Sequence, residues 1–202
     1  MRDQYGNTDT AEIYFHVYSP IAFDLNGDGG IGVTGVTSSW QKEGDDVLGR
    51  TVSFDIDGNG TLDTIEWFAG DGDGILIDNR DGNAANDMDG NRLFGDQGGQ
   101  YGNGYEKLAE LDSNNDGQLT GEELAGLEFW IDNGNAIVDE GELVSLDSYD
   151  VVQISTTMNT GYDELGRELM QSSAMTKDGS EILTEDVWFN SAQQNDHFEF
   201  LA

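Results

Sequence analysis

The chain has 202 residues, of which 36% are hydrophobic, and its 4 Trp, 7 Tyr and 9 Phe are enough to build a core. Its 41 acidic residues against 8 basic ones give a formal net charge of −33. Self-repulsion of this size destabilises a compact state unless bound cations neutralise it. Nucleic acids and anionic lipid surfaces are excluded as natural partners, because both require a basic footprint.

The chain contains no cysteine, so metal ions are the expected staple of a loop-rich fold. No stretch reaches the roughly 20 apolar residues that span a bilayer. Met1 leads directly into polar, mid-domain sequence rather than a signal peptide. This start predicts a piece cut from a longer chain.

In chain order, residues 9–18 alternate in polarity and predict a strand, and Pro20 marks a boundary before the main domain. Between 21 and 104, short β-branched or aromatic runs separated by Asp/Asn/Gly clusters predict short strands joined by turns. Residues 105–111 and 121–130 have helical composition, and strands return afterwards. We expect an α+β domain of short strands and loops organised around several Ca²⁺ sites. Its two or three short helices would include one EF-hand-like helix–loop–helix.

Two segments match the 12-residue calcium loop completely. Such a loop supplies oxygen ligands from positions 1, 3, 5, 7 and 9 and a bidentate acid at 12, and glycine at position 6 permits the sharp turn. Leu62 and Leu119 stand at position 8, where an apolar side chain would tie each loop to a core. Asx-Gly turns arise by chance in any acidic chain, but two complete matches predict calcium at both. The predicted ligands are Asp55, Asp57, Asn59, Thr61, Asp63 and Glu66 in the first loop, and Asp112, Asn114, Asp116, Gln118 and Glu123 in the second.

Three further segments match the calcium loop in part. The segment that begins at Asp24 has Gly35 at position 12, so its last ligand must come from elsewhere in the fold. The segment 132–142 is one residue short of the standard spacing, and the dense acidic field 71–91 would hold one or two ions. A solvated acidic loop is the alternative for that field. The predicted ligands are Asp24, Asn26 and Asp28; Asp132, Asn135, the Ile137 carbonyl and Glu142; and Asp71, Asp73, Asp78, Asp87, Asp89 and Asn91.

The order and spacing of these motifs carry a family resemblance over roughly residues 19–190. The motifs are PIAFDLNGDG (20–29), FDIDGNG (54–60) leading to Trp67, LFGD (93–96), LAELDSNNDG (108–117), WID (130–132) leading to GEL (141–143), and DGS (178–180) leading to DVWF (186–189). In this arrangement the chain resembles a calcium-binding domain of bacterial RTX adhesins and related secreted proteins. Within that group it is most similar to the calcium-dependent peptide-binding domain of giant ice-binding and biofilm adhesins.

The resemblance implies a cell-adhesion module in residues 19–190 that holds several Ca²⁺ ions and captures the free C-terminus of a partner protein through a calcium-bound carboxylate. The implied partners are C-terminal peptides of surface proteins on other cells. The implied location is extracellular, on the bacterial cell surface, as a monomeric module of a long multidomain adhesin without membrane insertion. Residues 1–18 would end a preceding immunoglobulin-like repeat or linker. Phe198 and Phe200 predict that the tail 191–202 docks as a strand.

Arg92 stands where the wider family usually has a glutamate before Leu-Phe-Gly. Loss of that bidentate ligand would leave the nearby ion unsaturated and open to a peptide carboxylate. The glycine-rich segment that follows would present backbone N–H groups to an extended peptide. A flexible loop beside a purely structural ion is the alternative. The predicted peptide-binding residues are Asp87, Asp89, Arg92, Gln97, Gly98 and Tyr101.

We expect a binding module rather than an enzyme. His16 and His197 lie in no recognisable catalytic motif, no His-Glu-x-x-His zinc motif occurs, and the lack of cysteine excludes thiol chemistry. Glycoside hydrolysis by paired carboxylates stays open in so acidic a chain. Two alternatives to peptide capture remain: a calcium-dependent carbohydrate-binding module, and a purely structural calcium domain of a secreted RTX protein.

Overall fold

The computed structural model describes residues 17–35 and 48–191. The strand expected over 9–18 lies outside these residues except for its last two, and so does the tail after Ser191. Both histidines lie outside them as well. Within the described ranges, no helix is long and apolar enough to cross a membrane.

Short strands dominate the described chain, and one short α-helix, α1 (Gly104–Leu108), accompanies them. Single turns of 3-10 helix cover Gly90–Arg92, Ala109–Leu111, Gly121–Leu124 and Leu146–Tyr149. The strands are β1 (Val17–Tyr18), β2 (Ile21–Phe23), β3 (Thr51–Phe54), β4 (Asp63–Glu66), β5 (Gly74–Asp78), β6 (Gln118–Thr120), β7 (Leu127–Trp130), β8 (Leu143–Ser145), β9 (Val151–Ser155), β10 (Asn159–Tyr162), β11 (Glu168–Thr176), β12 (Glu181–Asp186) and β13 (Phe189–Asn190).

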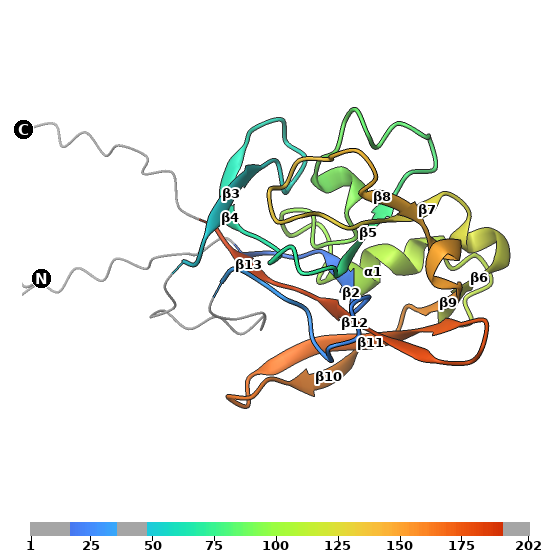
Figure 1. Cartoon of the computed structure of the whole chain (residues 1–202). Helices are drawn as coiled ribbons and strands as arrows, with labels where there is room; N and C mark the ends of the chain where they lie inside the picture. Colours follow the sequence, from blue (N-terminus) through green and yellow to red (C-terminus); the bar gives the residue numbers. More distant parts are fainter. Residues whose placement is uncertain (1–16, 36–47, 192–202) are drawn as a thin grey trace, which may run out of the picture.

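One antiparallel sheet forms the body of the molecule (Figure 1). Its strand order is β6-β9-β11-β12-β2-β5-β7-β8. The strand β10 pairs with the first four residues of β11, ahead of the part that pairs with β9. The sheet curls into a half-barrel. Two smaller antiparallel pairs, β1 with β13 and β3 with β4, complete the fold. The calcium-loop motifs lie in the connections between these strands.

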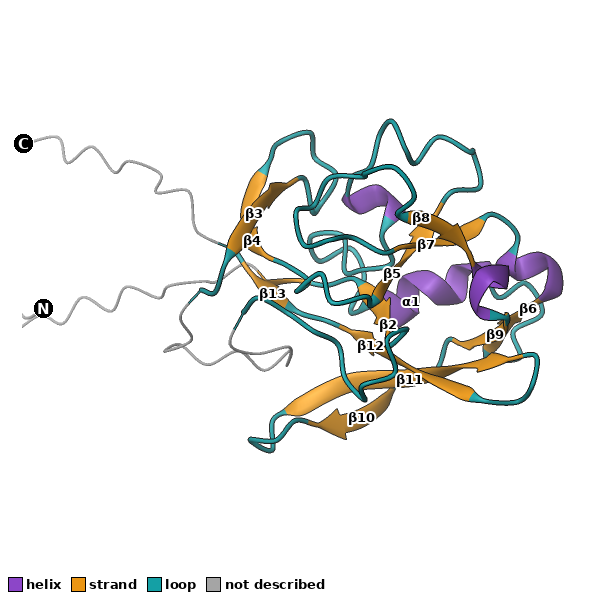
Figure 2. Cartoon of the chain, viewed as in Figure 1, coloured by secondary structure: helices purple, strands orange, loops and turns teal. Residues whose placement is uncertain are grey.

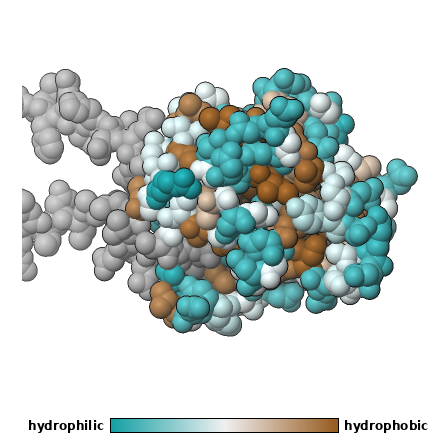
Figure 3. Space-filling model, viewed as in Figure 1, coloured by the Kyte–Doolittle hydropathy of each residue, from teal (hydrophilic) through white to brown (hydrophobic). Residues whose placement is uncertain are grey.

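The sheet separates two hydrophobic cores, because neighbouring side chains of a strand point to opposite faces. In β5, Leu76 joins one core, whereas Ile75 and Ile77 join the other. The first core is covered by α1 through Tyr105, and the second contains Trp67 next to the β3–β4 hairpin. Burial on both faces explains why the central strands are continuous apolar runs. Hydrophilic residues cover most of the face in Figure 3, with apolar patches between them.

The expected α+β class with an EF-hand-like helix pair is wrong. The first expected helix is present in part, as α1 and the 3-10 turn that follows it. The expected helix 121–130 is instead a 3-10 turn followed by β7 (Figure 2). Gly121 and Gly126 both have positive φ, 53° and 80°, which a helix interior does not accommodate. Leu127 and Phe129 are then buried on one face of a strand that pairs with β5 and β8.

The N-terminal segment enters the fold through a buried contact that includes two carboxylates. The backbone N–H of Ser19 donates to Asp96 Oδ1 at 3.1 Å, and Gly95 lies so close that a Cβ on it would be 1.5 Å from the Ser19 carbonyl oxygen. Asp186 is fully buried nearby and accepts the backbone N–H of Gly104 at 2.9 Å. Burial, reinforced by the charges of Asp96 and Glu185, raises the pKa of Asp186 to about 7.

This shift predicts a pH dependence of stability. Unfolded aspartate releases its proton near pH 4, whereas folded Asp186 keeps it to about pH 7. Between these values the folded state binds more protons, so the free energy of unfolding falls as pH rises. At saturating calcium, Asp186→Asn should therefore gain stability relative to the unsubstituted protein from about pH 4 to about pH 7, and no more above it. Urea unfolding at several pH values checks this. The exposed Glu164→Gln is the control, and parallel curves for D186N and the unsubstituted protein would refute it.

Candidate calcium sites

Three of the predicted loops share one backbone geometry. In each, the first aspartate accepts the N–H groups of the residues four and five positions later, at 2.8–3.2 Å. The sixth residue is a glycine with φ between 84° and 97°, which explains its selection. The carboxylates are therefore fixed by the main chain. The pairs are Asp24 with Asp28 and Gly29, Asp55 with Asn59 and Gly60, and Asp112 with Asp116 and Gly117.

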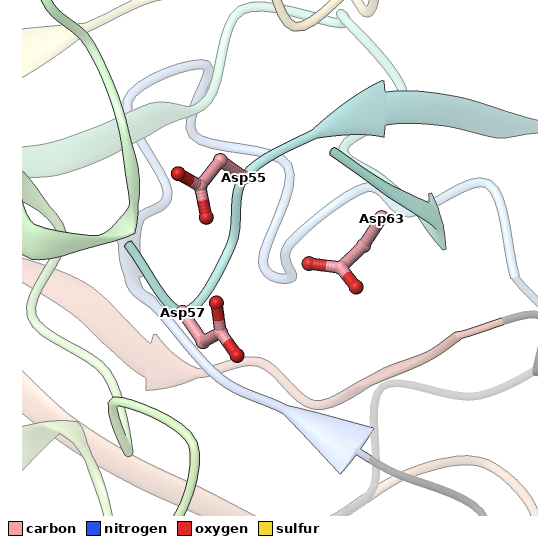
Figure 4. Close-up of side chains that lie close together, drawn as sticks. All are labelled: Asp55, Asp57 and Asp63. Carbon is pink, nitrogen blue, oxygen red and sulfur yellow. The ribbon is translucent and has the colours of Figure 1, made fainter. Parts of the chain in front are cut away.

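Asp55, Asp57 and Asp63 form the tightest acidic cluster among the described residues. One oxygen from each lies within 4.8 Å of the others, and all three side chains are partly buried. They come from the β3–β4 connection and the first residue of β4, and Figure 4 shows their carboxylates around a common space. Asn59 donates from its side chain to Asp57 at 2.9 Å, and its Oδ1 accepts the N–H of Thr61 at 2.8 Å. Three negative charges at this separation repel one another unless a cation lies between them.

Glu66, the predicted bidentate acid of this loop, does not join the cluster. It is fully buried and accepts the backbone N–H groups of Asn190 at 3.0 Å and Gly49 at 3.3 Å. Leu62 is 63% exposed, so it does not tie the loop to a core as expected. The structure thus gathers three of the predicted acids and leaves the closing position of the loop without its carboxylate.

The second complete loop does gather its closing acid. Glu123 accepts the N–H groups of Ser113 at 2.9 Å and Thr120 at 3.0 Å, so its carboxylate folds back over the loop. Leu119 is fully buried, as position 8 predicts. The main chain also fixes the two ligands between: Asn114 Oδ1 accepts from Asp116, and Asp116 accepts from Gln118.

The segment 132–142 is held by two tryptophans. Asp132 is buried and accepts a hydrogen bond from Trp67 Nε1 at 2.7 Å. Burial raises the pKa of Asp132 despite this hydrogen bond. Glu142 accepts Trp130 Nε1 at 3.1 Å. Asp139, which the motif reading missed, accepts the side-chain amide of Asn135 at 3.0 Å. The N–H of Ile137 donates to Asn135 Oδ1 at 2.7 Å, and its side chain is exposed.

The acidic field 71–91 divides into two places. Asp71 and Asp73 lie against residues 24–32, where the Gly32 N–H donates to Asp73 Oδ2 at 2.8 Å. The remainder lines a hollow of about 580 Å³ together with Arg80 and Arg92. Its acidic and amide lining residues are Asp78, Asp81, Asp87, Asp89 and Asn91.

Arg92 fills the cation position of this hollow. Its guanidinium donates to both Asp81 oxygens at 2.9 Å, to Asp87 Oδ1 at 2.5–2.9 Å and to the Asp78 carbonyl at 3.0 Å, so every N–H has a partner. Asp78 is paired with Arg80, and Asp89 accepts the N–H of Asn91. The guanidinium thus provides this loop with a cation from the chain itself.

The predicted peptide-binding residues separate in the same way. Gly98 lies beside Asp57, since a Cβ on it would be 3.4 Å from Asp57 Cβ, and the Gln97 side chain donates to the Gly90 carbonyl. The Tyr101 N–H donates to the Asp96 carbonyl at 3.0 Å. The glycine-rich segment therefore flanks the Asp55, Asp57 and Asp63 cluster, whereas Asp87, Asp89 and Arg92 line the hollow.

Removal of the Arg92 charge should destabilise the fold more than removal of the Arg80 charge. Arg92 is 11% exposed and holds two carboxylates, whereas Arg80 is 53% exposed and holds one. Arg92→Gln should lower the free energy of unfolding by about 2 kcal/mol, and Arg80→Gln by less than about 1 kcal/mol. Urea unfolding at saturating calcium measures both. Equal losses would contradict the assignment of Arg92 as an internal cation.

Comparison with known proteins places these loops in a family. A family model described as the SPM domain matches residues 21–190. The chain is 30% identical over 179 residues to the iron-regulated protein FrpA of Neisseria meningitidis serogroup C, which covers 85% of this chain and 14% of FrpA. The chain thus spans a small part of this curated relative. The resemblance to an adhesin peptide-binding domain stays a prediction. The match over residues 21–190 shows that the chain belongs to the SPM domain family.

Proposed function

We propose that the chain is a calcium-dependent binding module of a longer secreted protein. In this proposal Ca²⁺ stabilises the fold, and one ion also holds the carboxylate of a ligand. The observation that carries it is the cluster of Asp55, Asp57 and Asp63, whose closing acid, Glu66, is engaged elsewhere.

The donor set favours calcium over other metals. It consists of carboxylate, amide and carbonyl oxygens, the ligands of hard cations, and the chain has no cysteine. Mg²⁺ requires near-ideal octahedral geometry and keeps much of its water, whereas Ca²⁺ accepts irregular sets of about 6–8 oxygens. The net charge of −33 supports several ions, because each one reduces the self-repulsion of the folded chain.

Open coordination supports a ligand at this particular ion. Without Glu66, the loop lacks the bidentate acid that normally completes the shell. Positions therefore remain for water or for an incoming carboxylate. Gln97 and Gly98 lie next to the cluster and offer backbone to an extended peptide. This location replaces the ion predicted at Asp87 and Asp89, because the Arg92 guanidinium already lies between Asp81 and Asp87.

The ligand class we propose is the free C-terminus of a peptide, and the proposed setting is adhesion at a bacterial cell surface, where extracellular calcium fills the sites. A sugar diol is the competing ligand, since hydroxyl pairs also occupy open calcium positions. A purely structural calcium domain would bind neither. The chain spans 14% of FrpA, so peptide capture is proposed for this module alone.

Calcium removal should lower the melting temperature strongly. An ion at 100 times its dissociation constant stabilises the folded state by about 2.7 kcal/mol, which corresponds to about 5–10 °C for a domain of this size. Asp57→Asn should abolish part of the calcium-dependent gain, whereas the exposed Glu164→Gln should retain it. Melting followed by circular dichroism, with and without chelator, measures the gain. A melt unchanged by chelator would exclude calcium-dependent folding.

Ligand binding should require both calcium and a free carboxylate. The probe is an array of peptides with varied C-terminal residues, each made as free acid and as amide, beside an array of glycans. We expect binding to some free acids and at least tenfold weaker binding to the matching amides. Peptide binding should be lost in chelator, and it should be lost in the D57N variant under conditions where that variant is folded. Equal binding of acids and amides would refute carboxylate capture, and binding to glycans alone would favour the sugar reading.

A further inference from the structure

Two acidic loops that are far apart in the sequence meet in the fold. One is residues 24–32, which follow β2, and the other is residues 71–73, between β4 and β5. A Cβ on Gly32 would be 1.8 Å from Asp71 Oδ2, and one on Gly72 would be 3.6 Å from Asn26 Cβ. The Gly32 N–H donates to Asp73 Oδ2 at 2.8 Å. The two loops therefore touch through side chains on both sides.

Asp73 is the unusual member of this group. It is only 6% exposed, and its Oδ1 is enclosed with no hydrogen-bond partner among the described atoms. A buried carboxylate oxygen without a partner is costly, and native structures almost always satisfy such an atom. The carboxylates of Asp71, Asp24 and Asp28 lie close enough to act on Asp73 electrostatically. The surroundings of this oxygen are thus negative and call for a cation.

The other loop is already organised to supply the missing contacts. Asp24 accepts three backbone N–H groups, from Gly27 at 2.7 Å, Asp28 at 3.1 Å and Gly29 at 2.9 Å. Asn26 Oδ1 accepts the Asp28 N–H at 2.8 Å. These side chains hold the positions of the first half of a calcium loop, whose second half the local sequence does not provide.

We infer that a Ca²⁺ ion binds between the two loops, with ligands from both: Asp24, Asn26, Asp28, Asp71 and Asp73. The acid that the sequence around Gly35 lacks comes from the β4–β5 connection. The carboxylates of this group lie further apart than those of Asp55, Asp57 and Asp63. Binding of the ion would therefore require the exposed side chains of Asp71 and Asp28 to turn toward Asp73.

The consequence is a metal cross-link between residues 24–32 and residues 71–73, which are distant in the sequence. Residues 24–32 contain no strand or helix, and their main-chain contacts with the body are few. The ion would fix them to the loop that leads into β5, a strand near the centre of the sheet. This inference rests on the proposed calcium binding and adds to it a site that no single stretch of sequence contains.

Calcium stoichiometry tests the composite site. Equilibrium dialysis and calorimetric titration with CaCl₂ should give one ion fewer per molecule for Asp73→Asn than for the unsubstituted chain. Asp57→Asn should lose a different ion, so the double variant loses two. Asp71→Asn, at an exposed position, keeps the test valid where D73N folds poorly: it should weaken one site about tenfold or more. Glu164→Gln is the matched control with unchanged binding.

Hydrogen exchange locates the lost ion. Calcium should slow amide exchange in residues 24–32 of the unsubstituted chain and of D57N, but not of D73N or D71N. Unchanged stoichiometry and protection in both D73N and D71N would overturn the composite site, while loss of an ion in D57N would leave the proposed function standing. An unsubstituted chain that binds no calcium would overturn both.

Discussion

Repulsion between carboxylates that the main chain holds in fixed positions is the constraint on which the rest of this structure depends. An aspartate at the start of a loop accepts N–H groups four and five residues later, so it cannot swing away from its neighbours. Free aspartates on a surface would separate and be screened by solvent. Here Asp55, Asp57 and Asp63 stay within 4.8 Å of one another. Such loops are stable when a cation offsets their charge.

The chain meets this need in two ways. At the hollow beside Gly90–Arg92, a guanidinium lies between Asp81 and Asp87, so the counter-charge is permanent and independent of the medium. At the other loops, we propose that the counter-charge comes from solution as calcium. Under the proposed calcium binding, this division gives one part of the surface a fixed structure and makes the rest responsive to calcium.

The two kinds of loop are in direct contact, so the proposed ion sites and the fold depend on each other. The Gly90 N–H donates to the Asp55 carbonyl at 2.7 Å, and a Cβ on Gly90 would be 1.7 Å from the Ile56 carbonyl oxygen. Only glycine fits there. Asn91 donates to the Gly58 carbonyl at 3.2 Å. The arginine-filled hollow thus supports the loop that we propose as the ligand site, and Gly98 borders it on another side.

Local chemistry in the sequence was sufficient to locate the acidic loops and most of the strands, because Asx-Gly turns and short apolar runs are decided by neighbouring residues. The fate of individual side chains was decided by contacts across the fold. Glu66 satisfies the position of a bidentate ligand in the sequence, yet the backbone N–H of Asn190 donates to it. The second half of the expected helix 121–130 is β7 instead, because β5 and β8 pair with it on either side. Asp73 meets residues 24–32 only through the tertiary structure. The sequence determined which oxygens are present, and the tertiary structure decided which of them lie together, since the ligands of a metal ion must be close in space rather than along the chain.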